Sequence, residues 1–101
     1  MAARNMRADY SPEVREAIAA GALTYKELNG LYCRFESGDY GDVDAGQIPA
    51  NREALRARSG NVWSLYHTEA GRNIYLIQFF SAPEDIGHFC YEGEPRFMRG
   101  R

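Results

Sequence analysis

The chain has few cysteines and no long apolar run, and these absences exclude several classes of protein. Its two cysteines, Cys33 and Cys90, lie far apart in 101 residues, so neither a C-x-x-C zinc ribbon nor a redox motif is present. No run approaches the roughly 18 apolar residues of a membrane-spanning helix, and no apolar segment follows Arg4 and Arg7 as it would in a signal peptide. The sequence therefore predicts a cytoplasmic protein with two free, buried thiols and no membrane partner.

The chain also lacks a strong net charge. Its 12 basic and 14 acidic residues are mixed along the sequence and give a net charge of −2. A general nucleic-acid-binding protein needs a basic surface that neutralises phosphates, so the charge disfavours that class. Hydrophobic residues make up 45% and charged residues 26%, as in ordinary globular domains, and the length suits one domain.

The amino-terminal end predicts a flexible tail followed by a helix. Residues 1–10 are polar and show no periodicity, so we expect a flexible tail there and a single α+β domain over residues 11–101. Ser11 is a favourable N-cap, and Pro12 suits the first helical position. Gly21 suits the position directly after a helix, where the backbone takes the left-handed conformation. The first helix is therefore expected between Pro12 and Gly21.

Signals for two more helices follow. Thr24 and Glu27 form a T-x-x-E capping box. Apolar residues then recur with the spacing of one helix face, at Leu28, Leu31, Tyr32 and Phe35. Gly38 ends this helix, and a short third helix is expected over residues 49–58.

The second half of the chain changes to the period of β-strands. Residues 61–67 alternate between two faces, a turn containing Gly71 follows, and residues 73–80 are nearly continuous in β-forming side chains. Residues 86–91 suit a third strand. The order predicts an α+β fold, in which two or three N-terminal helices pack on a three-stranded antiparallel β-meander. The open edges of such a sheet would let two copies pair as a homodimer.

An Asp- and Gly-rich loop partly matches a calcium-binding pattern. Asp42, Asp44 and Glu53 stand where the first, third and twelfth ligands of that pattern would be. Gly46 and Gln47 occupy the positions that require an oxygen ligand and a glycine, so the match fails. We expect an Asp/Gly turn whose side chains bond their own backbone, and no metal site.

Catalytic groups are sparse as well. His67 and His88, taken with the two cysteines, lack the spacing of a zinc site. His88 and Cys90 are two residues apart on an expected strand and therefore share a face, but no glycine elbow or oxyanion-hole motif accompanies them. The sequence therefore predicts no catalytic residue, no cofactor and no enzyme.

Tyrosines and carboxylates supply the strongest hint of function. Aromatic residues make up 13% of the chain. Four tyrosines are expected near the surface, namely Tyr10, Tyr40, Tyr66 and Tyr91. Tyrosine beside acidic residues is typical of a protein-binding hot spot. The candidate partner-binding residues are Asp39, Tyr40, Asp42, Asp44 and Tyr66.

The central part of the sequence resembles a known group of proteins. A Gly-Asp-Tyr-Gly-Asp loop runs from Gly38 to Asp42. It is followed by an Asn-x-x-Ala-Leu helix pattern and a Ser-x-Tyr strand pattern, at Asn51, Ala54, Leu55, Ser64 and Tyr66. This combination resembles a family of small uncharacterised plasmid and prophage accessory proteins with a GDWGD-like loop. From Gln78 onward the chain departs from the family's polar pattern.

The resemblance implies an accessory protein of a mobile genetic element, and it carries no chemistry with it. The first hypothesis is a non-enzymatic counter-defence inhibitor, similar to an anti-CRISPR protein, that binds a host protein or ribonucleoprotein complex in the bacterial cytoplasm. Its acidic loop would meet basic residues that normally hold nucleic acid. The least favoured of the three hypotheses is a small hydrolase or metal protein centred on His88 and Cys90.

The alternative to the inhibitor is a nucleic-acid-associated regulator of a plasmid or phage. Its contacts would come from the arginines of the third helix, Arg52, Arg56 and Arg58, helped by Arg96, Arg99 and Arg101. Binding of this kind weakens steeply as salt is added, because it releases counterions from the phosphates.

Overall fold

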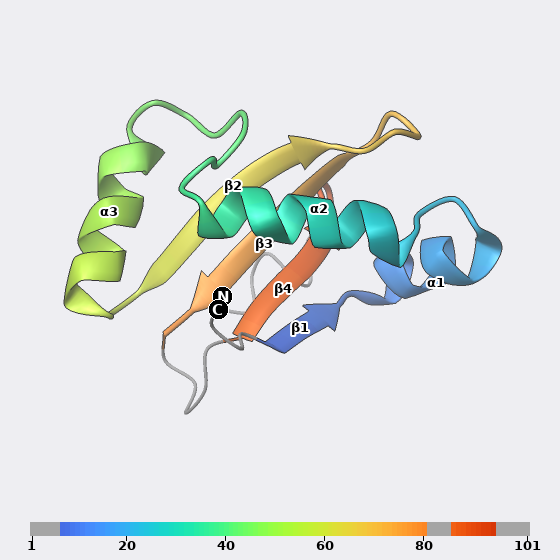
Figure 1. Cartoon of the computed structure of the whole chain (residues 1–101), viewed down its shortest axis with the longest axis horizontal. Coiled ribbons are helices and arrows are strands. Elements are labelled where there is room, and N and C mark those ends of the chain that lie inside the picture. The colour runs from blue at the N-terminus through green and yellow to red at the C-terminus, as the bar shows by residue number, and fades with distance from the viewer. Residues whose placement is uncertain (1–6, 81–85, 95–101) are drawn as a thin grey trace.

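Three helices and a four-stranded mixed sheet make up the structure, which confirms the α+β class (Figure 1). The computed structural model describes residues 7–80 and 86–94. The elements in chain order are β1 (Arg7–Tyr10), α1 (Pro12–Ala20), α2 (Tyr25–Glu36), α3 (Gln47–Ala57), β2 (Asn61–His67), β3 (Asn73–Phe79) and β4 (Ile86–Tyr91).

The sheet differs from the predicted three-stranded meander. Its strand order is β1-β4-β3-β2, with β1 parallel to β4 and the other pairs antiparallel. The expectation of a tail over residues 1–10 is therefore wrong for residues 7–10, which form β1. This strand is too short to show a hydrophobic period, and its partner lies at the opposite end of the chain. Tyr10 is held there because its ring stacks on Phe89 at 5.8 Å.

Local signals place the first two helices where the sequence predicts them. The Ser11 hydroxyl accepts a hydrogen bond from the Val14 amide at 3.2 Å, and Gly21 ends α1 with φ of 81°. The Thr24 hydroxyl accepts from the Glu27 amide at 3.1 Å at the start of α2. These are the N-cap and left-handed C-terminal contacts that satisfy otherwise unpaired backbone groups.

The third helix departs from the expected boundaries. It begins at Gln47, two residues before the expected residue 49, and its N-cap Gly46 has no side chain to bond the first turn. It ends at Ala57, where Arg58 takes the left-handed conformation with φ of 51° that a glycine would usually supply. Capping rules therefore predict the ends of α3 less well than they predict the ends of α1 and α2.

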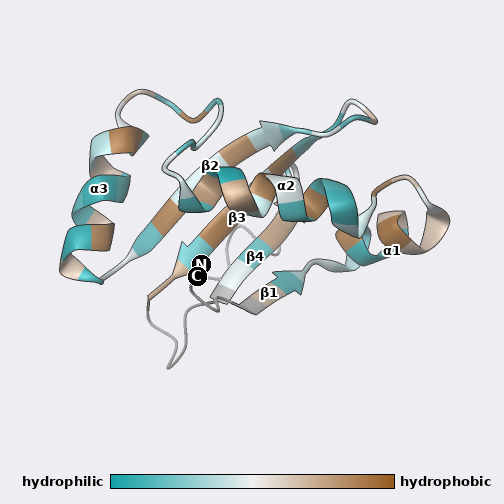
Figure 2. Ribbon diagram, viewed as in Figure 1, coloured by the Kyte–Doolittle hydropathy of each residue, from teal (hydrophilic) through white to brown (hydrophobic). Residues whose placement is uncertain are grey.

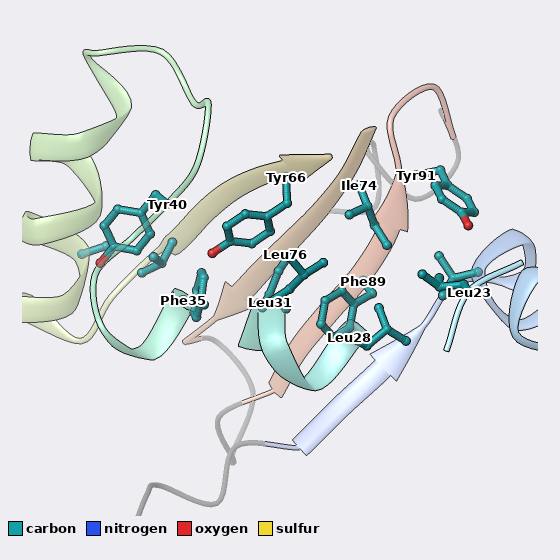
Figure 3. Packing of buried hydrophobic residues seen from close by; sticks show 13 residues of the cluster. Leu23, Leu28, Leu31, Phe35, Tyr40, Tyr66, Ile74, Leu76, Phe89 and Tyr91 are labelled. Atoms are coloured by element: carbon teal, nitrogen blue, oxygen red, sulfur yellow. The ribbon is translucent and has the colours of Figure 1, made fainter. Parts of the chain in front are cut away.

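The core lies between the sheet and α2, which runs across one face of the strands (Figures 1 and 3). Alternate strand residues point toward this helix, and Figure 2 shows the resulting alternation of apolar and polar residues along the chain. The buried side chains that form the main cluster on α2 and the strands are Leu28, Leu31, Phe35, Val62, Tyr66, Ile74, Leu76, Phe89 and Tyr91. Burial of this apolar surface is the main stabilising contribution to the fold.

The expectation that four tyrosines lie near the surface is wrong for Tyr40, Tyr66 and Tyr91. The exposed fractions are 8% for Tyr40, 1% for Tyr66 and 3% for Tyr91, and Tyr10 is half-buried. The first three rings lie in the main core and Tyr10 packs against it, because an aromatic side chain stabilises the fold more by burial than by exposure. Of the two thiols, Cys90 is buried as expected, whereas Cys33 is exposed.

Candidate functional site

The Asp/Gly loop is bound to the outer edge of β2. The Leu65 amide donates to the Tyr40 carbonyl at 3.1 Å, and the Asp42 amide donates to the Leu65 carbonyl at 2.8 Å. Gly41 forms a parallel bridge with Leu65 and has φ of 69°. A Cβ on Gly41 would lie 2.1 Å from the Leu65 carbonyl oxygen, so only glycine fits this close approach.

The edge of β2 next to this loop is covered by a side chain of α3. Asn51 is fully buried, its Nδ2 donates to the Trp63 carbonyl at 2.8 Å, and its Oδ1 accepts from the Trp63 amide at 3.0 Å. Gln47 Nε2 donates to the same Oδ1 at 2.9 Å. The asparagine therefore takes the place of a neighbouring strand at Trp63.

Side-chain contacts of Asp39 and Tyr66 hold the loop in place. Asp39 accepts from Arg34 Nε at 2.7 Å and from the Gly41 amide at 3.1 Å. These two contacts lower the pKa of the Asp39 carboxyl group, the arginine having the larger effect. The Tyr66 hydroxyl donates to the Asp39 carbonyl at 2.7 Å, and burial raises the pKa of that hydroxyl to about 12.

These contacts change the interpretation of the expected partner-binding residues. Tyr40 and Tyr66 are wrong as surface contacts, because both rings are buried beneath the loop. Asp39 is half-exposed but bound to Arg34. Asp42 and Asp44 are exposed, so their role as partner contacts stays a prediction. Much of the family-like pattern, including Asn51, therefore holds the loop and the edge strand in place.

A pocket of about 330 Å³ opens beside this loop, on the sheet face opposite α2. Its lining residues are Asp42, Val43, Asp44, Gln47, Trp63, Leu65, Tyr75 and Glu92, and we call it the acidic–aromatic pocket. Trp63 and Tyr75 come from neighbouring strands and pack edge to face at 5.5 Å. Three of the lining side chains are carboxylic acids, and no lysine or arginine lines the pocket within the described part of the chain.

One histidine connects two acids of this pocket. His67 Nε2 lies 2.5 Å from Asp42 Oδ2, and its Nδ1 lies 2.5 Å from Asn73 Oδ1. Asn73 Nδ2 donates to Glu92 Oε1 at 2.8 Å. The Asn73 side-chain oxygen is therefore the atom that faces the histidine. Both neighbours of His67 are thus acceptors, and they raise its pKa, Asp42 more than Asn73.

The pocket is suited to a positive group with an apolar stem. Carboxylates attract a guanidinium or ammonium group, and the faces of Trp and Tyr add a cation–π attraction. The indole and phenol rings would contact the methylene groups of a lysine or arginine side chain. Burial, followed by the nearby Glu92, raises the pKa of Tyr75, so its hydroxyl stays neutral and able to donate a hydrogen bond.

The remaining candidate groups lie elsewhere. His88 and Cys90 do share a sheet face, as their spacing predicts, but burial raises the pKa of the Cys90 thiol to about 12. A protonated thiol is a weak nucleophile. Burial lowers the pKa of His88, whose Nδ1 lies 3.8 Å from Asp9. Within residues 7–80 and 86–94, no three His, Cys, Asp or Glu side chains gather closely enough to hold a metal ion.

Two of the three candidate arginines, Arg56 in α3 and Arg58 directly after it, already make contacts within the protein. Arg56 forms an ion pair with Glu53 at 2.5 Å, and the Arg58 guanidinium lies 5.2 Å from the centre of the Phe80 ring. Arg52 is exposed on the same helix. The three C-terminal arginines that would assist them lie outside the described residues, so a nucleic-acid contact here stays a prediction.

No family model, no curated protein and no solved structure matches the chain. Among the helices in the described residues, none has both the length and the apolar character needed to cross a bilayer.

Sequence reasoning identified two of the three acids of the pocket, Asp42 and Asp44, but missed its aromatic wall. Trp63, Tyr75 and Glu92 were not among the candidate residues. The available signal was the strand period, because Trp63, Leu65, His67 and Tyr75 are odd-numbered residues of two paired strands and so share the face opposite the core.

Proposed function

We propose that this chain is a non-enzymatic binding protein whose acidic–aromatic pocket receives a cationic side chain of a partner protein. The observation that carries the proposal is the gathering of Asp42, Asp44 and Glu92 around Trp63 and Tyr75. Such a site selects a lysine or arginine by charge and by stacking, and it disfavours anionic groups.

The preorganised loop supports this function. Two backbone hydrogen bonds to Leu65 and the Asp39–Arg34 contact fix the loop before any partner arrives. A site that is already ordered loses less conformational entropy on binding than a flexible one. The carboxylates also create a local negative potential, which speeds association with a basic surface.

The biological role that fits this chemistry is occlusion of a nucleic-acid-binding surface. Lysines and arginines that hold phosphates would be neutralised by Asp42, Asp44 and Glu92. On a mobile genetic element, this activity would make the chain a counter-defence inhibitor, similar to an anti-CRISPR protein, that acts on a host protein or ribonucleoprotein complex. The family resemblance described above supports the mobile-element context.

A capture experiment tests the proposal. Tagged wild-type protein and the Asp42→Lys, Asp44→Lys double variant would be incubated with nuclease-treated bacterial lysate that contains active defence systems. The control variant, Glu16→Lys with Glu53→Lys, changes the net charge equally on exposed helix surfaces away from the pocket. We expect the wild type and the control to retain one stoichiometric partner that the pocket variant loses. Equal capture by all three proteins would contradict the proposal.

The nuclease step separates this proposal from the nucleic-acid alternative. A partner that disappears after nuclease treatment, with direct binding of DNA or RNA that weakens steeply with salt, would favour the α3 arginines instead. In that case Arg52→Glu would abolish binding, while the pocket variant would bind at least as well as the wild type.

A further inference from the structure

A second hollow lies on the α2 side of the sheet, away from the acidic–aromatic pocket. It has a volume of about 210 Å³ and is partly open to solvent, with residues 36–38 at one side. Its apolar walls are Phe35, Tyr40, Leu55 and Val62, and the amide side chain of Gln78 also lines it. We call it the Gln78 cavity. The rings of Phe35 and Tyr40 pack edge to face at 5.8 Å, which gives the cavity an aromatic side (Figure 3).

The Gln78 side chain is the feature that an ordinary core does not explain. It is fully buried, yet neither its Oε1 nor its Nε2 has a hydrogen-bond partner among the described residues. The other polar side chains on this sheet face are satisfied, because the Ser64 hydroxyl donates to the Leu76 carbonyl and the Tyr66 hydroxyl donates to the Asp39 carbonyl. A buried amide without partners destabilises the fold unless something else bonds it.

The donor and acceptor of the Gln78 amide define the kind of ligand that could form hydrogen bonds with it. A glutamine presents an acceptor and a donor side by side, so one ligand with a matching donor and acceptor bonds both atoms. The apolar walls and the aromatic rings favour a flat, uncharged ring. The cavity is smaller than a typical drug-sized site, so the ligand is a single ring or a small fused ring.

We propose that the Gln78 cavity binds a small neutral heterocycle with a lactam edge, of the kind that nucleobases carry. Gln78 Nε2 would donate to the ring carbonyl, and Gln78 Oε1 would accept from the neighbouring ring N–H. Phe35 and Tyr40 would contact the ring, and Glu36 at the rim would disfavour anionic ligands such as nucleotides. This site is separate from the proposed partner-binding pocket and does not depend on it.

A titration with a simple probe tests this inference. Uracil would be added to the full chain while amide proton–nitrogen correlation NMR follows the side-chain NH₂ of Gln78. The matched probe is uracil methylated on both ring nitrogens, which keeps the ring and the carbonyls but lacks the N–H donors. We expect uracil to shift the Gln78 signals and the methylated probe to bind about tenfold more weakly, because one hydrogen bond is lost.

Two variants complete the test. Gln78→Leu removes the amide at nearly constant volume, and Leu55→Phe narrows the cavity while keeping the amide. Both should weaken uracil binding by about tenfold or more, whereas Asp42→Lys with Asp44→Lys should leave it unchanged. The inference is overturned if uracil causes no shift at roughly 10 mM, which would mean a cavity holding only water, or if Gln78→Leu binds uracil as well as the wild type.

Discussion

The side-chain amide of Asn51 bonds both backbone groups of Trp63, as an adjacent strand would. Its Nδ2 donates to the Trp63 carbonyl at 2.8 Å, and the Trp63 amide donates to its Oδ1 at 3.0 Å. β2 is the outer strand of the sheet, so these backbone groups would otherwise be open to pairing with another copy. The same contact holds the indole that lines the acidic–aromatic pocket.

Removing the Asn51 amide should destabilise the protein and expose the edge of β2. Asn51→Leu leaves the Trp63 amide and carbonyl without partners, so we expect the free energy of unfolding to fall by about 2–4 kcal/mol. Asn29→Leu, at an exposed position on α2, is the control and should change stability by less than about 0.5 kcal/mol. Urea unfolding measures both variants. Equal stabilities would show that the edge contact contributes nothing.

Two glycines should respond oppositely to the same substitution. Gly41→Ala places a methyl group against the Leu65 carbonyl oxygen and forces an alanine into a positive φ, so we expect a loss of about 2–4 kcal/mol. Gly30 lies inside α2, and apart from the helix's own backbone no described residue has an atom within 4 Å of its Cβ position, so Gly30→Ala should raise the free energy of unfolding by about 0.5–1 kcal/mol. Thermal unfolding of the pair checks the prediction, and a neutral Gly41→Ala would contradict the loop geometry.

The pKa of His67 should lie above the ordinary histidine value of 6.5, and the pKa of His88 should lie below it. Hydrogen bonds from Asp42 and Asn73 raise the pKa of His67, whereas burial lowers the pKa of His88. The stabilising contribution of His67 is therefore fully present below pH 6.5 and is lost as the pH rises through its folded pKa. NMR titration of the imidazole signals, assigned with His67→Gln, measures both values. A His67 pKa below that of His88 would contradict the contacts.

Replacing Gln78 should stabilise the unliganded protein. Gln78→Leu removes an amide that is buried without partners and keeps nearly the same volume, so we expect a gain of about 1–3 kcal/mol in the free energy of unfolding. Asn51→Leu removes an amide whose oxygen and nitrogen both have partners, so it should change the free energy of unfolding in the opposite direction. A destabilised Gln78→Leu protein would mean that the amide has a structural partner after all.

The helices and the three antiparallel strands were predictable because their signals are local. The caps at Ser11 and Thr24 and the left-handed Gly21 act within a few residues of the backbone that they satisfy. β1 could not be predicted, because its four residues are defined only by pairing with β4 at the far end of the chain. A long-range contact of this kind leaves no period in so short a segment.

The candidate site was predicted in part. Asp42 and Asp44 stand out in the sequence as acids of a turn. Tyr40 was misplaced, because a tyrosine beside acids is typical of a binding surface but here its ring enters the core. The aromatic wall was missed because the strand period places Trp63 and Tyr75 on one sheet face but does not give the register of β2 and β3 that brings them together.

Trp63 offers the most direct measurement of the central claim, because it is the single tryptophan of the chain and lines the acidic–aromatic pocket. Its fluorescence would be recorded while an arginine-rich peptide is added to the wild type, to the Asp42→Lys, Asp44→Lys variant and to the Glu16→Lys, Glu53→Lys control. We predict a saturable change in the wild type and the control, and about tenfold weaker binding or none in the pocket variant. An unchanged spectrum, or equal binding by the pocket variant, would contradict the proposal that this pocket receives a cationic side chain.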